Sequence, residues 1–284
     1  MRQTSSVLYI AVDALLPERG KSLPGFDEFT VVLDHEGIPS VWLTSRSRLQ
    51  FDEPRRKLGH AHPFIAEDGS GAYLPEDYFH LRPDTADGRS SKASTMRLGR
   101  FTCIPIAEPL PAAANALDAL SQVTGVPLVT LRSLSGRELV QNTGLAPREA
   151  ELARQRDFDE LFFFAGASQV QTERFLAEGR RRGMEFRQRG MLWSAAIGAS
   201  IRRCVAALSK LYDRALRYHA PSVAIATEDV APKLFPFCDR NIFLAARVPE
   251  ATTDGRGYPR ARVLPLTPGV WEQVLETVAP NRNR

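Results

Sequence analysis

The sequence predicts an α/β protein whose parallel sheet is interrupted by an inserted α+β unit. Two observations support this prediction. Toward both ends of the chain, continuous apolar, β-prone runs alternate with helical stretches, as expected of strands covered on both faces. Between about residues 97 and 197, short strands and helices follow one another without that alternation. We therefore predict a main unit formed by residues 1–82 and 198–284, with residues 83–197 inserted between its two halves.

The first half of the main unit is predicted to contain three strands that each end in polar residues. They cover residues 7–12, 40–43 and 63–66, with a helical stretch between the last two. The residues at their ends are Asp13, Thr44-Ser45-Arg46 and Glu67-Asp68-Gly69. Ligands of open parallel sheets bind at the carboxyl ends of the strands. This edge is therefore the predicted binding site.

The remaining elements follow from local pattern. Residues 82–91 are poor in large apolar groups and are predicted to form a loop. In the inserted unit, strands are predicted at residues 101–106, 162–164, 185–187 and 192–195, and helices at 112–123, 147–156 and 170–181. After residue 198 the alternation returns, with helical stretches at 202–217 and 232–237 and strands at 222–226 and 242–246.

Composition excludes several classes of protein. The 284 residues are 43% hydrophobic and 25% charged, which is globular composition. The 37 basic and 33 acidic side chains give a net charge of only +4, too small to indicate a nucleic-acid partner.

No apolar run reaches the ~18 residues of a membrane helix. Three widely spaced cysteines indicate neither a disulfide framework nor a zinc site. We expect a cytoplasmic protein with no membrane partner; its oligomeric state is not predicted.

Several motifs, in the same order along the chain, resemble those of one enzyme family. Residues 44–48, Thr-Ser-Arg-Ser-Arg, are similar to the pattern S/T-S-K-T-R, and residues 63–69 to P-F-I-x-E-N-G. Residues 143–147 and 153–160 resemble T-G-[ML]-x-P and A-x-x-R-[ED]-[FY]-[DS]-E. These patterns are typical of mannosyl-3-phosphoglycerate phosphatases within the haloacid-dehalogenase-like (HAD) superfamily. The resemblance implies a HAD-like Rossmannoid core with an inserted α+β cap. It also implies Mg²⁺-dependent hydrolysis of a phosphorylated sugar acid.

The acidic positions of that family are altered in this chain. The family's D-x-D motif supplies a nucleophile and an acid/base residue. If Asp13 is the second Asp of the motif, Ala11 holds the place of the nucleophile; if Asp13 is the nucleophile, Leu15 holds the place of the acid. Where the family has G-D-x-x-N-D, Thr227 and Ala231 replace the two Asp residues. Glu228 and Asp229 stand nearby, either as displaced metal ligands or as solvated loop acids.

Groups that would hold a phosphate are better preserved. Thr44 keeps its hydroxyl, and Arg202 stands where the family has a Lys. By resemblance, the catalytic residues are Asp13, Thr44 and Arg202, the substrate-binding residues are Ser45, Arg46, Arg48 and Arg156, and the metal ligands are Asp13, Glu228 and Asp229. For Arg156, a structural salt bridge to Asp159 or Glu160 is the alternative.

A dense basic cluster in the inserted unit also has two interpretations. Arg180, Arg181 and Arg182 precede Gly183, and Arg187 and Arg189 follow it. They form either a solvated helix end with the adjoining turn or a surface that faces an anionic ligand.

Two functional hypotheses follow from these residues. In the first, the protein is a divergent mannosyl-3-phosphoglycerate phosphatase whose activity is impaired, with any residual activity resting on Asp13 and a displaced Glu228 or Asp229. In the second, it is a non-catalytic binding or regulatory pseudo-phosphatase. That protein would hold a phosphorylated or carboxylated sugar through Thr44, Arg46 and Arg202, and its use of Mg²⁺ is doubtful.

Overall fold

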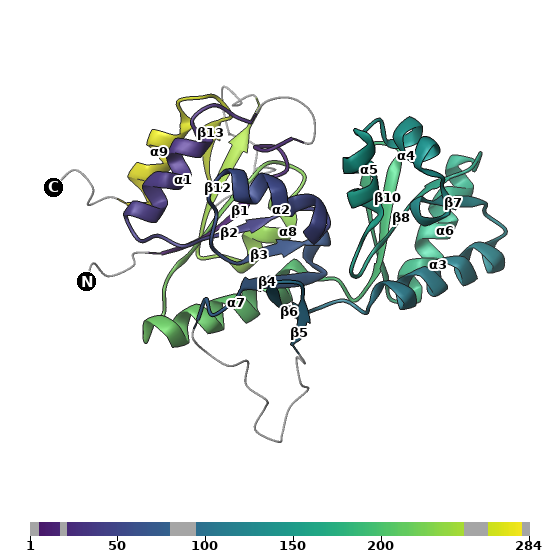
Figure 1. The fold of residues 1–284 in the computed structure, drawn as a ribbon, viewed down its shortest axis with the longest axis horizontal. Helices are drawn as coiled ribbons and strands as arrows, with labels where there is room; N and C mark the ends of the chain where they lie inside the picture. Colours follow the sequence, from purple (N-terminus) through teal and green to yellow (C-terminus); the bar gives the residue numbers. More distant parts are fainter. Residues whose placement is uncertain (1–5, 18–21, 80–94, 247–260, 280–284) are drawn as a thin grey trace, which may run out of the picture.

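A computed structural model describes residues 6–17, 22–79, 95–246 and 261–279, which form two β-sheets with flanking helices (Figure 1). The strands are β1 (Val7–Ala11), β2 (Ser40–Leu43), β3 (Phe64–Ala66), β4 (Gly71–Pro75), β5 (Met96–Leu98), β6 (Phe101–Pro105), β7 (Leu128–Thr130), β8 (Glu160–Phe164), β9 (Met184–Arg189), β10 (Leu192–Ile197), β11 (Ser222–Ala226), β12 (Arg240–Ala245) and β13 (Ala261–Pro265). The helices are α1 (Phe26–His35), α2 (Arg48–Lys57), α3 (Leu110–Thr124), α4 (Gly136–Thr143), α5 (Pro147–Arg154), α6 (Gln169–Arg181), α7 (Ile201–Leu216), α8 (Ala231–Leu234) and α9 (Val270–Val278).

The larger sheet has nine strands in the order β13-β12-β11-β1-β2-β3-β4-β6-β5. The strands from β13 to β3 pair in parallel, and β4, β6 and β5 extend the sheet in antiparallel pairs. The predicted parallel sheet is therefore confirmed. Because β1 lies between β11 and β2, the carboxyl ends of these three strands meet at one edge.

Helices cover both faces of this sheet, which is why its central strands are apolar throughout. Leu8 and Ile10 of β1 pack with residues of α1, α2 and α9 on one face. Tyr9 and Ala11 pack with residues of α7 and α8 on the other. All five residues of β1 are buried. Each fully buried large apolar side chain contributes about 1.5–3 kcal/mol to stability.

The smaller sheet is antiparallel, in the order β7-β8-β10-β9. Phe162 of β8 packs against Phe175 of α6, in a cluster that includes α3. Leu161 packs on the opposite face, with residues of α4 and α5. We call residues 108–197, which carry this sheet, the inserted unit, and the rest of the described chain the main unit.

The change from one unit to the other occurs later than the sequence pattern predicts. We expected residues 101–106 to belong to the inserted unit that begins at residue 83, but β5 and β6 pair with the larger sheet. Tyr73 of β4 stands opposite Cys103 of β6, and burial of Phe101 and Cys103 in the core of the main unit fixes this pairing. The predicted boundary at residue 82 and the predicted loop at 82–91 lie outside the described residues.

The chain passes between the units twice, at adjoining points. The backbone N–H of Glu108 donates to the carbonyl of Ile197 at 3.0 Å, which joins the two crossing segments. Arg203 of α7 donates to the carbonyl of Ile106 at 3.1 Å. Within the described ranges, no helix is both long enough and apolar enough to cross a bilayer.

Candidate functional site

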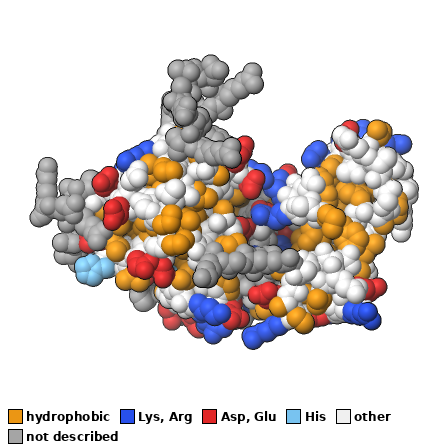
Figure 2. Space-filling view, turned by 90° about the horizontal axis from the view of Figure 1, so that it is seen from above, with side chains coloured by type: hydrophobic (Ala, Val, Ile, Leu, Met, Phe, Trp, Pro, Cys, Tyr) orange, Lys and Arg blue, Asp and Glu red, His pale blue; other side chains and the backbone are white. Residues whose placement is uncertain are grey.

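A cavity of about 210 Å³ opens at the carboxyl edge of the larger sheet. Its wall is formed by residues at and after the ends of four strands of the main unit, by Ile201 of α7 and by one arginine of the inserted unit. Its polar side chains belong to Asp13, Thr44, Ser45, Asp68, Arg189, Thr227 and Asp229. Strand ends separated along the sequence therefore converge here as the strand pattern predicts. Figure 2 shows basic side chains gathered along the seam between the units.

Asp13 is the centre of the polar contacts in this cavity. Thr44 Oγ1 donates to Oδ1 of Asp13 at 2.5 Å. Ser45 donates to Oδ2 through its backbone N–H at 2.9 Å and through its hydroxyl at 2.6 Å. The chain direction at the ends of β1 and β2 thus brings Thr44 and Ser45 onto a single carboxylate.

The cation nearest this carboxylate comes from the inserted unit. Arg189 ends β9, and its Nη1 lies 3.3 Å from Oδ2 of Asp13 while its Nη2 lies 2.8 Å from Oδ1 of Asp68. Burial opposes ionisation of Asp13, but Arg189, Arg46 and the two hydroxyl groups outweigh it and lower the pKa of Asp13. Asp13 is therefore ionised at neutral pH, with Arg189 as its counter-ion.

Gly69 lines the cavity and lies close to the first residue of α7. Its φ is +95°, and a Cβ there would lie 2.6 Å from the backbone nitrogen of Ile201. The carbonyl of Gly69 accepts from the backbone N–H of Ser200 at 3.0 Å. Only glycine fits both the positive φ and this close approach, so Gly69 determines how near α7 comes to Asp68.

The loop after β11 contributes unequally to the site. Asp229 and Thr227 line the cavity, whereas Glu228 is exposed and does not line it. The predicted set of Asp13, Glu228 and Asp229 is thus not brought together as a whole. Lys233 of α8 is half-buried beside this loop, and burial together with Arg187 and Arg189 lowers its pKa.

The donors at this edge do not fit a Mg²⁺ ion. Mg²⁺ requires a near-octahedral set of oxygen ligands and is usually held by one or two carboxylates. Here both oxygens of Asp13 already accept hydrogen bonds, and a guanidinium stands beside them. Across the described part of the chain, no three acidic, His or Cys side chains form a group able to hold a metal. We derive no chemical step through a metal.

Arg202 does not reach the cavity, which corrects the prediction that it holds a phosphate. Ile201, Cys204 and Val205 are the buried residues of the first turns of α7, so position 202 falls on the exposed face. Its guanidinium carbon lies 5.7 Å from the centre of the Phe237 ring.

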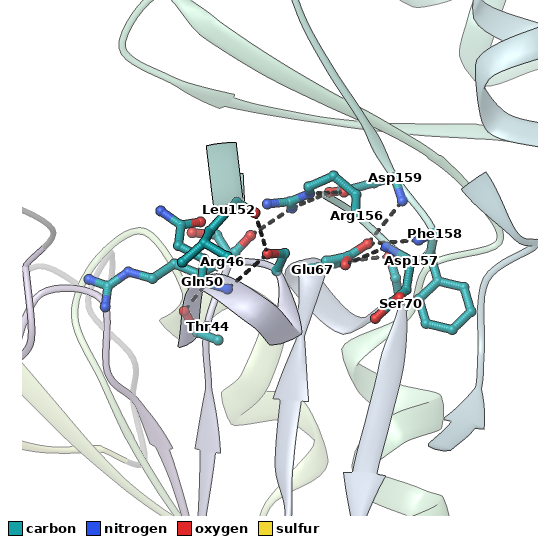
Figure 3. A network of polar contacts seen from close by, with 12 residues as sticks. Thr44, Arg46, Gln50, Glu67, Ser70, Leu152, Arg156, Asp157, Phe158 and Asp159 are labelled. Atoms are coloured by element: carbon teal, nitrogen blue, oxygen red, sulfur yellow. Dashed lines mark hydrogen bonds and ion pairs between the residues drawn. The ribbon is translucent and has the colours of Figure 1, made fainter. Parts of the chain in front are cut away.

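Two predicted substrate-binding arginines are committed to protein groups instead. Arg46 is buried and donates to the carbonyl of Leu16, and Figure 3 shows its side chain pointing away from Glu67. Arg48 donates through Nε to Oδ2 of Asp157 at 3.0 Å, and Tyr73 donates to the same oxygen at 2.8 Å. Arg48 lines neither this cavity nor the neighbouring one, because Asp157 of the inserted unit holds it.

Arg156 makes the salt bridge that was the alternative to substrate binding. It contacts Asp159 at 2.5 Å and 2.8 Å, and it donates to the carbonyl of Ser45 at 2.8 Å. With both side chains buried, losing one partner of this pair would cost about 3–5 kcal/mol. Arg156 thus connects the strand end at Ser45 to the inserted unit.

Glu67 makes a second connection of this kind (Figure 3). Its carboxylate accepts three backbone hydrogen bonds, at 2.9 to 3.0 Å, from the consecutive residues Asp157, Phe158 and Asp159. Burial, with Asp159 adding to it, raises the pKa of Glu67 to about 8. Because Glu67 directly precedes Asp68, the connection between the units and the cavity share one turn.

Four residues in or beside this site had no individual role assigned from the sequence. Glu67 and Asp68 were placed only among the polar residues of the predicted binding edge, although two acids at a strand end of a parallel sheet are a signal for a site. Arg189 belonged to the basic cluster for which a surface facing an anion was one interpretation. Lys233 carried no signal beyond its charge.

Comparison with known proteins gives two kinds of likeness. No family model matches the chain. It is 23% identical over 181 residues to a glucosyl-3-phosphoglycerate/mannosyl-3-phosphoglycerate phosphatase of Methanococcoides burtonii, covering 64% of this chain and 63% of that protein. It is 26% identical over 160 residues to the mannosyl-3-phosphoglycerate phosphatase of Pyrococcus furiosus, covering 55% and 60%. The chain thus matches less than two thirds of the length of these curated relatives.

Solved structures share the fold. A phosphatase of the haloalkanoate (HAD) superfamily from Bacteroides thetaiotaomicron superposes with a TM-score of 0.60 at 13% identity, covering 98% of this chain and 96% of that one. A haloacid dehalogenase-like hydrolase from B. subtilis gives 0.57 at 12% identity, covering 84% and 89%. These likenesses confirm the predicted fold class and the resemblance on which it rests.

Proposed function

We propose that this chain, a HAD-like protein similar in sequence to mannosyl-3-phosphoglycerate phosphatases, binds a small phosphorylated or carboxylated molecule at the cavity around Asp13 rather than hydrolysing it. A phosphorylated sugar acid is the ligand class that the resemblance implies. The protein is then a divergent relative of these phosphatases that keeps an anion site and has lost metal-assisted turnover.

One observation carries the proposal: a guanidinium of the chain itself neutralises Asp13. Arg189 lies 3.3 Å from this carboxylate and is 41% exposed, so it also presents N–H groups to the cavity. A planar guanidinium binds phosphate and carboxylate oxygens well. An incoming anion would share Arg189 with Asp13 and Asp68 and would approach the hydroxyls of Thr44 and Ser45.

The arrangement also argues against rapid hydrolysis. Attack on phosphorus would use a lone pair of the Asp13 carboxylate, and the hydrogen bonds from Thr44 and Ser45 together with the Arg189 cation lower the nucleophilicity of both oxygens. Protonation of the leaving group needs a second carboxylate two residues before or after Asp13. Those positions hold Ala11 and Leu15, whose side chains are apolar and buried.

The substitution Asp13→Asn separates binding from catalysis because the two functions predict opposite results. In a binding protein it removes a negative charge beside the anion and releases Arg189 to the ligand. We expect inorganic phosphate to bind about tenfold more tightly, as measured by titration calorimetry in EDTA. The matched control is Asp34→Asn, which makes the same charge change on α1, away from the cavity.

The phosphatase hypothesis is tested in the same experiment. Phosphate release from mannosyl-3-phosphoglycerate is measured with Mg²⁺ and with EDTA for the natural chain and for Asp13→Asn. The binding function predicts no turnover above background in any of these conditions. Mg²⁺-dependent turnover that Asp13→Asn abolishes would overturn the proposal and assign catalysis to Asp13.

A further inference from the structure

A second cavity, of about 220 Å³, adjoins the one around Asp13. The two share Ser45, Asp68 and Arg189 in their walls, so a ligand whose anionic group contacts Arg189 has its remaining atoms directed toward the second cavity. What this second wall is made of therefore decides what kind of molecule fits beyond the anion.

The inserted unit contributes an aliphatic cluster to this wall, beside Trp193 and four polar residues. Leu131, Leu145 and Ala153 are buried there, and Leu161 and Leu192 pack against them. Leu161 and Leu192 belong to the face of the smaller sheet that α4 and α5 cover, and Ala153 belongs to α5. The aliphatic cluster has no polar group to offer a ligand.

Most of the polar groups that line this cavity are already engaged. Ser45 donates to Asp13 at 2.6 Å, and Asp68 accepts from Arg189 at 2.8 Å. Gln50 and Ser194 are further polar residues of its wall. Thr143 Oγ1 donates to the carbonyl of Leu139 at 2.6 Å. Arg156 is held by Asp159 and by the carbonyl of Ser45. A sugar bound here would bury several hydroxyl groups with few partners, and each unpaired polar group that is buried weakens binding. An apolar group would gain from the same contacts.

We propose that the ligand of this chain is a phosphate or carboxylate whose attached group is a compact aliphatic or aromatic body rather than a sugar. The anion lies at Arg189, Thr44 and Ser45, and the body lies against Leu161 and Leu192. The inference rests on the proposed function and narrows its ligand class, away from the sugar acid of the relatives.

Three probes of the same anionic group test it: inorganic phosphate, phenyl phosphate and glucose 6-phosphate, titrated into the full chain in EDTA. We expect phenyl phosphate to bind at least about tenfold more tightly than either of the others. Equal affinities, or tighter binding of glucose 6-phosphate, would overturn this inference and leave the proposed anion site standing. If none of the three binds, both proposals are wrong.

Two substitutions in one hairpin locate the effect. Leu192→Gln puts an amide into the aliphatic wall, whereas Met191→Gln makes a comparable change at a side chain that is 78% exposed and does not line this cavity. We expect Leu192→Gln to reduce phenyl phosphate affinity to that of inorganic phosphate, and Met191→Gln to preserve the difference. Binding of inorganic phosphate, unchanged in both, reports that the fold is intact. A preference for phenyl phosphate that survives Leu192→Gln contradicts the placement.

Discussion

The ion pair between Asp13 and Arg189 determines the chemistry of the cavity. A carboxylate that accepts hydrogen bonds from two hydroxyls in a partly buried place needs a positive charge nearby, because desolvation opposes its ionisation. In this chain the charge comes from a side chain of the inserted unit, 176 positions later in the sequence. Its presence gives the site a fixed cation that does not depend on a metal in solution.

Removing that cation should weaken anion binding. We expect Arg189→Gln to reduce the affinity for inorganic phosphate at least about tenfold, since a charge-assisted contact is lost and Asp13 then repels the ligand. Titration calorimetry measures the change. Arg174→Gln, the same loss of charge on an exposed position of α6, is the control and should bind phosphate normally. Equal affinities in the two variants would exclude Arg189 from the anion site.

Glu67 makes stability depend on pH in an unusual direction. Burial, with Asp159 adding to it, raises its pKa from 4.5 to about 8, so the folded protein binds more protons than the unfolded chain between these values. Stability should therefore fall as the pH rises through this window, by up to about 1.4 kcal/mol per pH unit. Glu160, with a pKa raised to about 7, adds to the slope at its lower end, so Glu67 dominates from pH 7 to 8.

Glu67→Gln tests this directly, because it keeps an acceptor oxygen and removes the titration. Thermal unfolding measured between pH 7 and 8 should show a falling midpoint for the natural chain and a flatter profile for the variant. The exposed Glu173→Gln is the control and should keep the natural slope. A variant profile as steep as the natural one would mean that another group is responsible.

For single residues, the sequence predicts those positions that depend on local geometry alone, such as the end of a strand. Asp13, Thr44 and Ser45 meet because each follows a strand of one parallel sheet, and that much follows from pattern. Arg202 was misplaced because a motif position says nothing about helix phase, and the buried residues of α7 turn it outward. Arg48 could not be placed because its partner, Asp157, lies 109 positions away in the other unit.

At the level of elements, continuous apolar strands were the most predictable. β1, β2 and β11 are buried on both faces, and their continuous apolar runs predict strands from the sequence alone. By contrast, α1 was not predicted, although Phe26, Phe29, Thr30 and Leu33 form the buried face of a helix. β6 was found as a strand but assigned to the wrong sheet, since local pattern fixes the type of an element and only its partners fix its sheet.

The approach of the turn at Gly69 to α7 is the element contact most sensitive to a small change. Gly69→Ala should destabilise the protein by more than about 2 kcal/mol, because it combines a positive φ with a methyl group 2.6 Å from a backbone nitrogen. Denaturant unfolding measures the loss. Gly166→Ala shares the positive φ, of +74°, but meets open space, and should cost only about 1 kcal/mol. Similar losses at both positions would show that α7 yields to the added methyl group.

Over the whole molecule, polar contacts at the seam hold the two units in one arrangement. Glu67 binds the backbone of residues 157–159, Asp157 accepts from Arg48 and Tyr73, and Ser47 donates to the carbonyl of Leu152 at 2.9 Å. Both cavities lie within this seam. None of these contacts could be foreseen from the sequence, because each joins residues distant in the chain.

Because the donors around Asp13 do not fit Mg²⁺, we expect the stability of the whole chain not to depend on this ion. We expect the same thermal midpoint in excess MgCl₂ and in EDTA, with inorganic phosphate raising it equally in both by binding to the folded state. Differential scanning calorimetry makes the comparison. A midpoint that Mg²⁺ raises, or a phosphate effect that EDTA removes, would mean that a metal binds here after all.

The hydrogen bond between Glu108 and Ile197 has a consequence for engineering. Since the two crossing segments adjoin, the inserted unit starts and finishes at one place on the main unit. Residues 108–197 could accordingly be exchanged as a cassette, with a different ligand-selecting module grafted at the same pair of junctions while the strand order of the larger sheet is kept.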